Sequence, residues 1–360
     1  MREFTRELVR QGIRVELVDC TDWGATRLPS NMIDPWFDSL IRRGDAQVAL
    51  YFTLPVQVIL DRTIPTINYT MFEATRVPEE WIEHNLRHDL VIVPTESSRT
   101  AWIASGLPEE RIRVSPLGIN PHLFGQPVVP LSFRTQSGRP IVDYRARFLN
   151  VSEIGPRKNL VGLLRAWLDA TREDDDAILI LKLGRYAPGW FELMMMQMRR
   201  LEAETGRRFL DAAPVEMLFD LLPDAEMPRL FAVATHYISL SHGEGWDQPM
   251  VEAAASGLRL IAPDHSAYPA YLSPRTATLI PSREVPARFE GDPQLQRMFA
   301  GANWWEPDPE AAVAAIRAAI ERPDVGPYGA REEVLARFTW EQATRQLINV
   351  LEDVLVTARA

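Results

Sequence analysis

The stretch over residues 241–257, SHGEGWDQPMVEAAASG, combines residue types that can hold a polar ligand. Gly243 and Gly245 flank Glu244 directly after a strand-like run, and glycine at such positions lets a ligand approach the backbone closely. The carboxylate of Glu244 can accept hydrogen bonds from hydroxyl groups. The loop therefore predicts a binding site for a hydroxyl-rich or anionic ligand.

The residues that follow predict a helix whose N-terminus faces the same site. Asp247 and then Pro249 are typical of a helix start, where free amide groups and the positive dipole end attract anions. Glu252 lies about 7.5 Å further along the axis, at ~1.5 Å per residue, so two carboxylates could hold one elongated polar ligand. The alternative is a structural strand–turn–helix with two solvated glutamates. The glycines, Trp246 and the proline favour the binding function.

Positive charge is scarce and unevenly placed. The formal net charge of −10 argues against a general role in binding nucleic acid or an anionic membrane. Only two of the 39 basic residues are lysines, Lys158 and Lys182. Arg157 and Lys158 precede a predicted helix, where two cations are unfavourable near the positive dipole end unless an anion is bound. The pair predicts an anion site, with a solvated surface pair as the alternative.

Two other features favour structural roles. His84 and His88 have the i, i+4 spacing of helical metal ligands, but no matching third ligand is evident, so we expect a polar helix face and no metal site. Cys20 is the only cysteine, which excludes an intrachain disulfide and a cysteine-built zinc site and suits a reducing compartment. No activating base is evident for Cys20, so we expect it to be inert.

Alternating strands and helices must position these residues. Before residue 125 the sequence predicts helices over 4–9, 34–44, 78–88 and 95–106, and strands over 14–19, 47–53, 66–72 and 90–93. Residues 125–140 are rich in proline, glycine and serine and predict a linker. The later part predicts strands over 148–151, 177–183, 215–219, 237–240 and 258–262, and helices over 159–171, 248–256, 309–321 and 340–357.

This alternation predicts two α/β domains with mostly parallel sheets and a ligand-binding cleft between them. We expect an N-terminal domain over residues 1–128, a C-terminal domain over 129–338, and a closing helix over 339–360 that packs back on the N-terminal domain. No G-x-G-x-x-G run follows a predicted strand, which argues against a dinucleotide-dependent oxidoreductase.

The run GEGWDQPMVEAAASG is similar to the signature E-G-(F/W)-x-x-P-x-x-E-A-x-A-x-G of the GT-B-fold retaining glycosyltransferases of family 4, also called group 1 glycosyltransferases. Three more runs resemble the same family, in the same order along the chain. VPTESSRTAWIASGLPEERIRVSPLGINPHLF looks like its last N-domain helix and the run into the linker. FLNVSEIGPRKNLVGLLRAW looks like the first strand–loop–helix of its C-terminal domain, and FTWEQATRQLINVLEDV looks like its closing helix.

The resemblance implies a GT-B fold, with two Rossmann-like domains facing a cleft. It implies transfer of a sugar from a nucleotide-diphospho-sugar to a hydroxyl of a glycan, lipid or small-molecule acceptor, with retention of configuration. No metal and no cofactor beyond this nucleotide-sugar co-substrate are implied. In the family pattern Glu244 binds sugar hydroxyls, while Lys158 and Arg157 neutralise the diphosphate. The implied donor-binding residues are Glu252, which binds the ribose, and Gly243, Gly245, Trp246 and Asp247.

The chain departs from the family pattern near the expected site. Glu153 stands where arginine is common, and Ala270 stands where a glutamate is common. The usual N-domain histidine is not evident, and Glu73 or Arg76 is expected to substitute for it, unless the two simply pair with each other. Glu153, together with a first strand that is not found in the sequence, leaves an alternative function, a catalytically silent GT-B subunit that binds sugar or a partner enzyme.

The beginning of the sequence departs further from the family. Residues 1–10 read as the first helix and 14–19 as the second strand, so the first strand and glycine-rich turn of the N-terminal domain are not found. We expect either a start further upstream or a partner chain or dimer that completes the sheet. No signal-peptide core is present, and the most apolar stretch, 48–60, is shorter than the ~20 residues of a membrane span. We expect a cytoplasmic protein, with peripheral contact at the inner membrane face as an alternative.

Overall fold

The structure is a computed structural model of the chain. It describes residues 1–18, 34–41, 44–58, 60, 63–135, 137–184, 189–289 and 292–359. Cys20 and Asp19, the last residue of the predicted strand over 14–19, lie outside these ranges.

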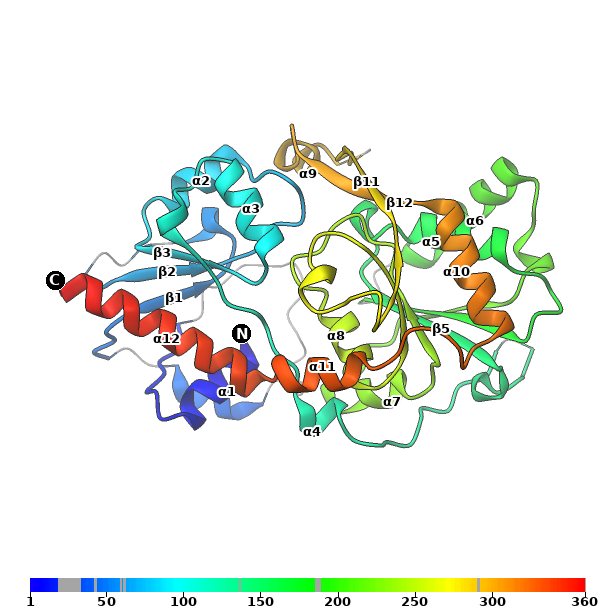
Figure 1. Cartoon of the computed structure of the whole chain (residues 1–360), viewed down its shortest axis with the longest axis horizontal. Helices are drawn as coiled ribbons and strands as arrows, with labels where there is room; N and C mark the ends of the chain where they lie inside the picture. The colour runs from blue at the N-terminus through cyan, green and yellow to red at the C-terminus, as the bar shows by residue number, and fades with distance from the viewer. Residues whose placement is uncertain are drawn as a thin grey trace.

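The first part of the chain forms a four-stranded parallel sheet flanked by helices (Figure 1). Its strands are β1 (Ala49–Phe52), β2 (Thr66–Tyr69), β3 (Leu90–Val93) and β4 (Ile112–Val114), in that spatial order. Its helices are α1 (Arg2–Arg10), α2 (Glu79–Asn85), α3 (Glu96–Ala104) and, from the other end of the chain, α12 (Trp340–Arg359). All residues of β2 and β3 are buried, because parallel sheets of this kind are covered on both faces.

The second part forms a six-stranded parallel sheet in the order β10-β9-β8-β5-β6-β7. Its strands are β5 (Ala146–Ser152), β6 (Ala177–Leu183), β7 (Val215–Leu218), β8 (His236–Ile238), β9 (Arg259–Pro263) and β10 (Thr278–Ile280). The helices around it are α4 (Pro121–Phe124), α5 (Leu160–Ala170), α6 (Trp190–Thr205), α7 (Met227–Phe231), α8 (Gln248–Ala255), α10 (Pro309–Glu321) and α11 (Ala330–Arg337). β5 and β6 pair in register from Ala146↔Ala177 to Ser152↔Leu183.

Alternation along β6 divides the core of this second domain between the two faces of the sheet. Ile178 and Ile180 join a cluster with α7 and α8, whereas Leu179 and Leu181 join a cluster with α5, α6 and α10. Because successive side chains of a strand point to opposite faces, Lys182 follows Ile180 on the α8 side. The sheet therefore carries one lysine to the same face as the predicted ligand-binding helix.

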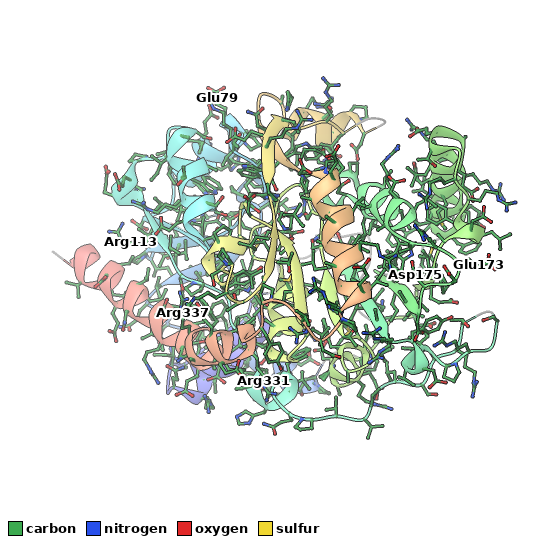
Figure 2. All side chains as sticks on the ribbon, turned by 45° about the vertical axis from the view of Figure 1, so that its right-hand side comes forward. Glu79, Arg113, Glu173, Asp175, Arg331 and Arg337 are labelled. Atoms are coloured by element: carbon green, nitrogen blue, oxygen red, sulfur yellow. The ribbon has the colours of Figure 1, made fainter. Side chains whose placement is uncertain are left out.

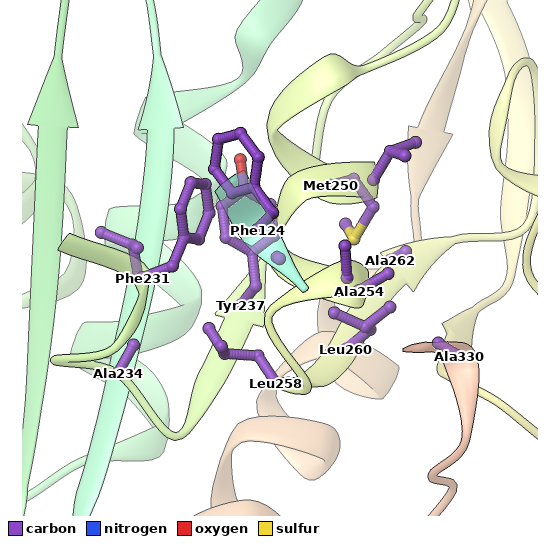
Figure 3. Close-up of a cluster of buried hydrophobic side chains, with 14 of the residues drawn as sticks. Phe124, Phe231, Ala234, Tyr237, Met250, Ala254, Leu258, Leu260, Ala262 and Ala330 are labelled. Carbon is purple, nitrogen blue, oxygen red and sulfur yellow. The ribbon is translucent and has the colours of Figure 1, made fainter. Parts of the chain in front are cut away.

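The cluster on the α8 face also receives side chains from the connecting segments (Figure 3). Phe124 of α4 packs on Phe231 with ring centroids 5.8 Å apart. Ala330 of α11 belongs to the same cluster. The predicted N-terminal domain runs to residue 128, but Ile119 and Phe124 already pack in the C-terminal core, because the chain crosses between the domains before that residue.

Two segments, residues 118–119 and 338–340, cross between the domains side by side, and we call them the crossover. The N–H of Ile119 donates to Phe338 O at 2.7 Å, and the N–H of Trp340 donates to Ile119 O at 3.1 Å. At Gly118 a Cβ would lie 2.6 Å from the Cα of Trp340, so the close approach requires glycine. The crossover lies along the lower side of the molecule in Figure 1.

α12 packs against the N-terminal sheet after this crossing. Leu347 and Leu351 of α12 share one buried cluster with Phe4 of α1 and Tyr69 of β2. Phe4 also contacts Trp340, with ring centroids 5.0 Å apart. The last helix of the chain therefore covers the first sheet.

A segment that the sequence did not predict projects from the C-terminal domain toward the N-terminal domain. Strands β11 (Ser282–Pro286) and β12 (Asn303–Pro307) pair antiparallel, with α9 (Pro293–Met298) between them. We call residues 282–289 and 292–307 the arm. Figure 1 shows the arm at the top, on the opposite side of the molecule from the crossover.

Two predictions for the first 44 residues are wrong. The helix predicted over 34–44 is a 3-10 helix of six residues, Pro35–Leu40. This helix ends at Leu40, because the N–H of Leu17 donates to Leu40 O at 2.8 Å and Leu17 pairs with Ile41 in a parallel bridge. Within residues 14–18 this bridge is the one β pairing found, so the described part of the predicted strand is not a strand of the sheet. Among the described residues β1 pairs on one side alone, with β2.

Charged side chains cover the outside of both domains. Glu79, Arg113 and Glu173 are exposed, and Figure 2 shows them at three separate places on the surface. In the ranges that the structure describes, every helix is too short or too polar to cross a membrane.

We predict that Leu347→Ala lowers the free energy of unfolding by about 3 kcal/mol, the usual cost of a cavity in a packed core. Leu347 is 0% exposed in the cluster between α12 and the N-terminal sheet. Urea denaturation followed by tryptophan fluorescence measures the change. Glu352→Ala, at an exposed position of the same helix, is the control and should change the value by less than about 0.5 kcal/mol. A loss below 1 kcal/mol at Leu347 would contradict the described packing of α12.

Candidate active site

The predicted site residues meet where the strand order of the second sheet reverses direction. The chain runs outward from β5 to β6 and β7, then returns to place β8 on the other side of β5. Ligands of such sheets bind beyond the carboxyl ends of the strands at this reversal. The loop after β5 carries Arg157 and Lys158, and the loop after β8 carries Glu244, so both predicted motifs lie at one place.

Glu244 joins the two cations in a buried ion-pair cluster. Lys158 Nζ lies 2.7 Å from Glu244 Oε1, and Arg157 Nη1 lies 3.0 Å from Glu244 Oε2. The side chain of Glu244 is 6% exposed, compared with 17% for Lys158 and 21% for Arg157. Burial opposes the charge of Glu244, but Arg157 and Lys158 outweigh burial and lower its pKa. Glu244 is therefore ionised at neutral pH.

Backbone hydrogen bonds lock the two loops together around this cluster. Arg157 Nη1 donates to Gly243 O at 2.7 Å, and the N–H of His242 donates to Arg157 O at 2.8 Å. The N–H of Glu244 donates to Ser266 Oγ at 3.1 Å. Ser266 has a φ of 49°, a left-handed conformation that turns its hydroxyl toward Glu244. Loops from three strands thus fix the carboxylate.

The cluster retains hydrogen-bond donors beyond those that Glu244 uses. An ammonium group has three N–H donors and a guanidinium has five. Among the described residues, Lys158 uses one of them, on Glu244, and Arg157 uses Nη1 on Glu244 and on Gly243 O. The remaining donors can serve an anion next to the carboxylate.

The N-terminus of α8 is left without a side-chain cap. Asp247 occupies the N-cap position with a φ of 58°, and its side chain makes no capping hydrogen bond. Instead Tyr268 donates its hydroxyl to Asp247 Oδ2 at 2.9 Å. Within the described part of the chain, the backbone N–H groups of Gly245, Trp246, Asp247 and Gln248 have no hydrogen-bond acceptor. An uncapped N-terminus of this kind can bind an anion or sugar oxygens.

The two other carboxyl groups of the motif bind protons more tightly than usual. Burial, and then the charge of Glu244, raise the pKa of Asp247 to about 6, although Lys158 and Tyr268 oppose the shift. Burial raises the pKa of Glu252 to about 8, although a hydrogen bond from Gln248 lowers it. At neutral pH Asp247 is mostly ionised and Glu252 is mostly protonated.

A loop of the N-terminal domain packs directly on the Glu244 loop. At Gly243 a Cβ would collide with Glu73 O, and at Gly245 it would lie 2.6 Å from Met71 Sδ. The sequence predicts that Gly243 and Gly245 let a ligand approach the backbone. In the structure they let the loop of residues 71–73 approach the Glu244 loop. The predicted cleft is closed at this point in the structure.

The structure separates the two N-domain candidates. Arg157 Nη2 lies 3.8 Å from Glu73 Oε1, so Glu73 belongs to the same charge cluster. Arg76 is exposed, and no hydrogen bond or ion pair joins it to another described residue. The predicted pairing of Glu73 with Arg76 is therefore not observed, because Glu73 pairs across the domains with Arg157.

The structure places one departure from the family pattern, Glu153, and one predicted donor-binding residue, Trp246. Glu153 is exposed and lies beside Gly184. Burial lowers the pKa of Arg157, but the negative charges of Glu73, Glu244 and, with a smaller effect, Glu153 outweigh burial and raise it. Trp246 is 2% exposed and packs on Tyr271 and Phe338, so its side chain is part of the core.

Aromatic and histidine contacts that no sequence pattern predicts surround this loop. His242 stacks on Trp304 of the arm, with ring centroids 4.4 Å apart and an angle of 24°. His265 stacks on Trp305 at 5.0 Å and 12°, and burial lowers the pKa of His265 to about 3. The signal in the sequence was the adjacent pair of tryptophans, but only the fold brings them to histidines some 40 to 60 positions earlier.

Lys182 is a second buried group near the site, and no sequence motif includes it. It is 6% exposed, and its Nζ donates to Leu183 O at 2.9 Å, at the carboxyl end of β6. Burial lowers its pKa, and Asp220 opposes the shift.

His84 and His88 line a cavity of about 230 Å³ on the N-terminal domain, together with Pro55, Val58, Leu60 and Arg87. Burial lowers the pKa of His88 to about 4. Among the described residues, no group of three or more His, Cys, Asp or Glu side chains is arranged to hold a metal ion.

We predict that Glu244→Gln destabilises the protein by about 3 kcal/mol. The substitution leaves two partly buried cations without their closest anion, and removal of one partner from such a pair is costly. Differential scanning fluorimetry or urea denaturation measures the loss. Sulfate, which can replace the missing charge, should raise the melting temperature of the variant more than that of the wild type.

Glu226→Gln is the matched control, because Glu226 pairs with Arg229 at 2.8 Å on the surface, with side chains 34% and 38% exposed. A surface pair contributes less than about 1 kcal/mol. Equal losses in the two variants would contradict the buried ion-pair cluster.

We predict a pH-dependent contribution of Glu252 to stability. Its pKa rises on folding from 4.5 to about 8, so the folded state holds the proton more tightly. The stabilisation is fully present below pH 4.5 and is lost as the pH rises toward 8. The difference in unfolding free energy between Glu252→Gln and the wild type should therefore increase from pH 5 to 8, by on the order of 3 to 4 kcal/mol at 1.36 kcal/mol per pKa unit. A difference that stays constant over this range would show that Glu252 titrates normally.

Comparison with known proteins gives matches among solved structures. No protein-family model and no curated protein sequence matches this chain. The HepE protein of Anabaena, crystallised with UDP and glucose, matches with a TM-score of 0.57 and 16% identity over 81% of this chain and 72% of its own. Sucrose-phosphate synthase from Thermosynechococcus elongatus matches with a TM-score of 0.56 and 18% identity, over 82% and 69%. Trehalose-6-phosphate synthase from Burkholderia multivorans matches with a TM-score of 0.57 and 14% identity, over 89% and 74%.

These structures are GT-B glycosyltransferases, and at such identities the likeness concerns the fold. The predicted fold class is confirmed: the chain has the GT-B fold, with two Rossmann-like domains that each carry a parallel sheet.

Proposed function

We propose that this protein is a retaining glycosyltransferase of family 4 type, which moves a sugar from a nucleotide-diphospho-sugar to an acceptor hydroxyl. The observation that carries the proposal is the joint placement of Glu244, Lys158 and Arg157 beside the uncapped N-terminus of α8. A carboxylate that can accept hydrogen bonds from sugar hydroxyls, two fixed positive charges and the free amide donors of α8 then lie together. A sugar diphosphate needs all three. The fold shared with HepE, whose structure holds UDP and glucose, supports the same class of ligand.

In the proposed complex the positive groups serve the leaving diphosphate. Negative charge accumulates on the phosphate as the bond to the sugar breaks, and preorganised donors at that position lower the barrier. Lys158 and Arg157 have unused N–H groups next to Glu244, and the α8 amides add neutral donors. The sugar leaves as an oxocarbenium-like species, and the leaving phosphate takes the proton of the acceptor hydroxyl. No protein nucleophile is required.

Glu244 has a different proposed task, to accept hydrogen bonds from the sugar hydroxyls. Its lowered pKa keeps it ionised for this purpose, and its two neighbouring cations hold its orientation. Glu252 is proposed to accept hydrogen bonds from the ribose hydroxyls. Because its pKa of about 8 leaves it mostly protonated, ribose binding should favour its ionised form and release a proton.

The N-terminal domain is proposed to bind the acceptor. Glu73 is the N-domain group that reaches the charge cluster, through Arg157. The tight packing of residues 71–73 on the Glu244 loop excludes water, which limits hydrolysis of an activated donor. A donor must enter with the two domains further apart than they stand here.

The proposal includes no resident cofactor and no metal, with the nucleotide-sugar as co-substrate and a glycan, lipid or small-molecule acceptor. We further propose a cytoplasmic location, with peripheral contact at the inner membrane face as the alternative. We also propose that a partner chain or a second copy completes the N-terminal sheet, in which the described pairing of β1 is with β2.

A catalytically silent GT-B subunit is the second candidate function. The observation that favours it is the engagement of Lys158 and Arg157 by Glu244, with Glu73 close by and Glu153 adding negative potential. Three carboxylates around these cations weaken their attraction for a diphosphate.

We predict that the protein releases nucleotide from one member of a panel of UDP-, GDP- and ADP-sugars when an acceptor is supplied. Lys158→Met should lower kcat by about a hundredfold or more, the usual loss when a donor to a developing negative charge is removed. Nucleotide release is measured with a coupled luminescence assay.

Arg199→Met removes one exposed cation from the same domain and should leave kcat unchanged. Thermal shift with the free nucleotides separates the two candidate functions, since a nucleotide at 100 times its Kd stabilises by about 2.7 kcal/mol. Stabilisation without release from any donor would support the silent subunit. If no nucleotide stabilises the protein and no donor releases nucleotide, both candidate functions are contradicted.

A further inference from the structure

The arm contacts both sides of the candidate site with consecutive residues of one strand. At the start of β12, Asn303 binds the N-terminal domain: the N–H of Thr75 donates to Asn303 O at 2.8 Å, and the N–H of Asn303 donates to Thr75 Oγ1 at 2.9 Å. Thr75 lies two residues after Glu73. The arm therefore fixes the backbone next to the one N-domain carboxylate that reaches Arg157.

The next residues of β12 bind the Glu244 loop. Trp304 stacks on His242 at 4.4 Å, the N–H of Trp305 donates to His242 O at 2.9 Å, and Glu306 Oε2 lies 2.9 Å from His242 Nε2. His242 in turn lies 3.1 Å, through Nδ1, from Pro156 O, the residue before Arg157. One strand thus holds Glu73 at one end and the Arg157 backbone at the other.

Aromatic packing attaches the arm more firmly to the N-terminal domain. Phe299 stacks on Phe72 with ring centroids 4.7 Å apart and an angle of 27°. Phe289 and Trp304 share a buried cluster with Trp81 of α2 and Trp102 of α3. This surface lies opposite the crossover, so the domains are joined covalently on one side and by the arm on the other (Figure 1).

We propose that the arm is a latch between the domains, and that Thr75, Asn303 and Phe299 are positioning residues that hold Glu73 against Arg157. When the latch is closed, Glu73 completes the charge cluster and residues 71–73 seal the Glu244 loop. When the Phe72–Phe299 and Thr75–Asn303 contacts separate, the domains open about the crossover and a donor can enter. The catalytic part of this inference rests on the proposed function, whereas the latch itself does not.

The latch is tested first by a measurement that does not depend on activity. Small-angle X-ray scattering of the full chain gives the radius of gyration, which should be larger in Thr75→Val and Phe299→Ala than in the wild type, and largest in the double variant. Valine matches the shape of threonine but removes the acceptor for the Asn303 N–H. Thr75→Ser keeps that acceptor and should behave as the wild type.

Arg283→Ala is the control within the arm, because Arg283 is exposed on β11 and, among the described residues, no hydrogen bond or ion pair joins it to the N-terminal domain. Its radius of gyration should equal that of the wild type. Circular dichroism identifies any variant that fails to fold, and Thr75→Val, the smallest change, then decides the result. Unchanged radii in Thr75→Val and in a folded Phe299→Ala would overturn the latch.

The positioning role is tested by kinetics with the donor that the wild type accepts. Opening should lower kcat by about fivefold in Thr75→Val, the factor that corresponds to one neutral hydrogen bond of about 1 kcal/mol. The KM for the donor should stay within about twofold, because the proposed donor contacts all lie on the C-terminal domain. If the variants have a larger radius of gyration than the wild type but the same kcat, the positioning role is overturned. Larger radii with no turnover in any protein, wild type included, would support the latch and overturn the proposed function.

Discussion

The ion-pair cluster of Glu244 with Lys158 and Arg157 is the interaction on which the rest of the site depends. A carboxylate that is 6% exposed cannot remain ionised without nearby positive charge, and two cations supply that charge from a loop more than 80 residues earlier. The same arginine binds Gly243 O and faces Glu73 of the other domain. One buried charge therefore ties together two loops of the second sheet and one loop of the first.

The protonation of the neighbouring groups follows from this cluster. Glu244 takes the available cations, so Asp247 and Glu252 are buried with less compensation and their pKa values rise. Asp247 turns to Tyr268 rather than to the amides of α8, and this leaves the helix N-terminus open. In the part of the chain that the structure describes, the amides of residues 245–248 therefore stay available to a ligand.

The relative position of the domains is set from two sides. The crossover holds the chains so closely at Gly118 that no side chain fits, and Gln248 of α8 donates to Gly118 O at 3.0 Å. The arm holds the opposite side through aromatic stacking, one backbone–backbone hydrogen bond from Thr75 to Asn303, and one hydrogen bond from the Asn303 N–H to Thr75 Oγ1. The candidate site, where Glu73 faces Arg157, lies between these two attachments (Figure 1).

Much of this was determined by the sequence alone. Hydrophobic periodicity and turn residues predicted the parallel sheets and most helices, because burial and local geometry act on neighbouring residues. The GEGWDQP run predicted the strand–turn–helix and the candidate residues on it. The predicted helix over 34–44 failed because a pairing with Leu17, distant in sequence, ended it at Leu40.

Only the tertiary structure decided which charges meet. The sequence could not show that Glu73 faces Arg157 rather than Arg76, that Asp247 leaves its helix for Tyr268, or that Trp304 stacks on His242. Each of these contacts joins residues of different segments that the folded chain brings together, and their strength depends on burial that no local pattern encodes. The physical reason is that pairing energies of charges and rings are set by distance and solvent exclusion, which exist only in the folded chain.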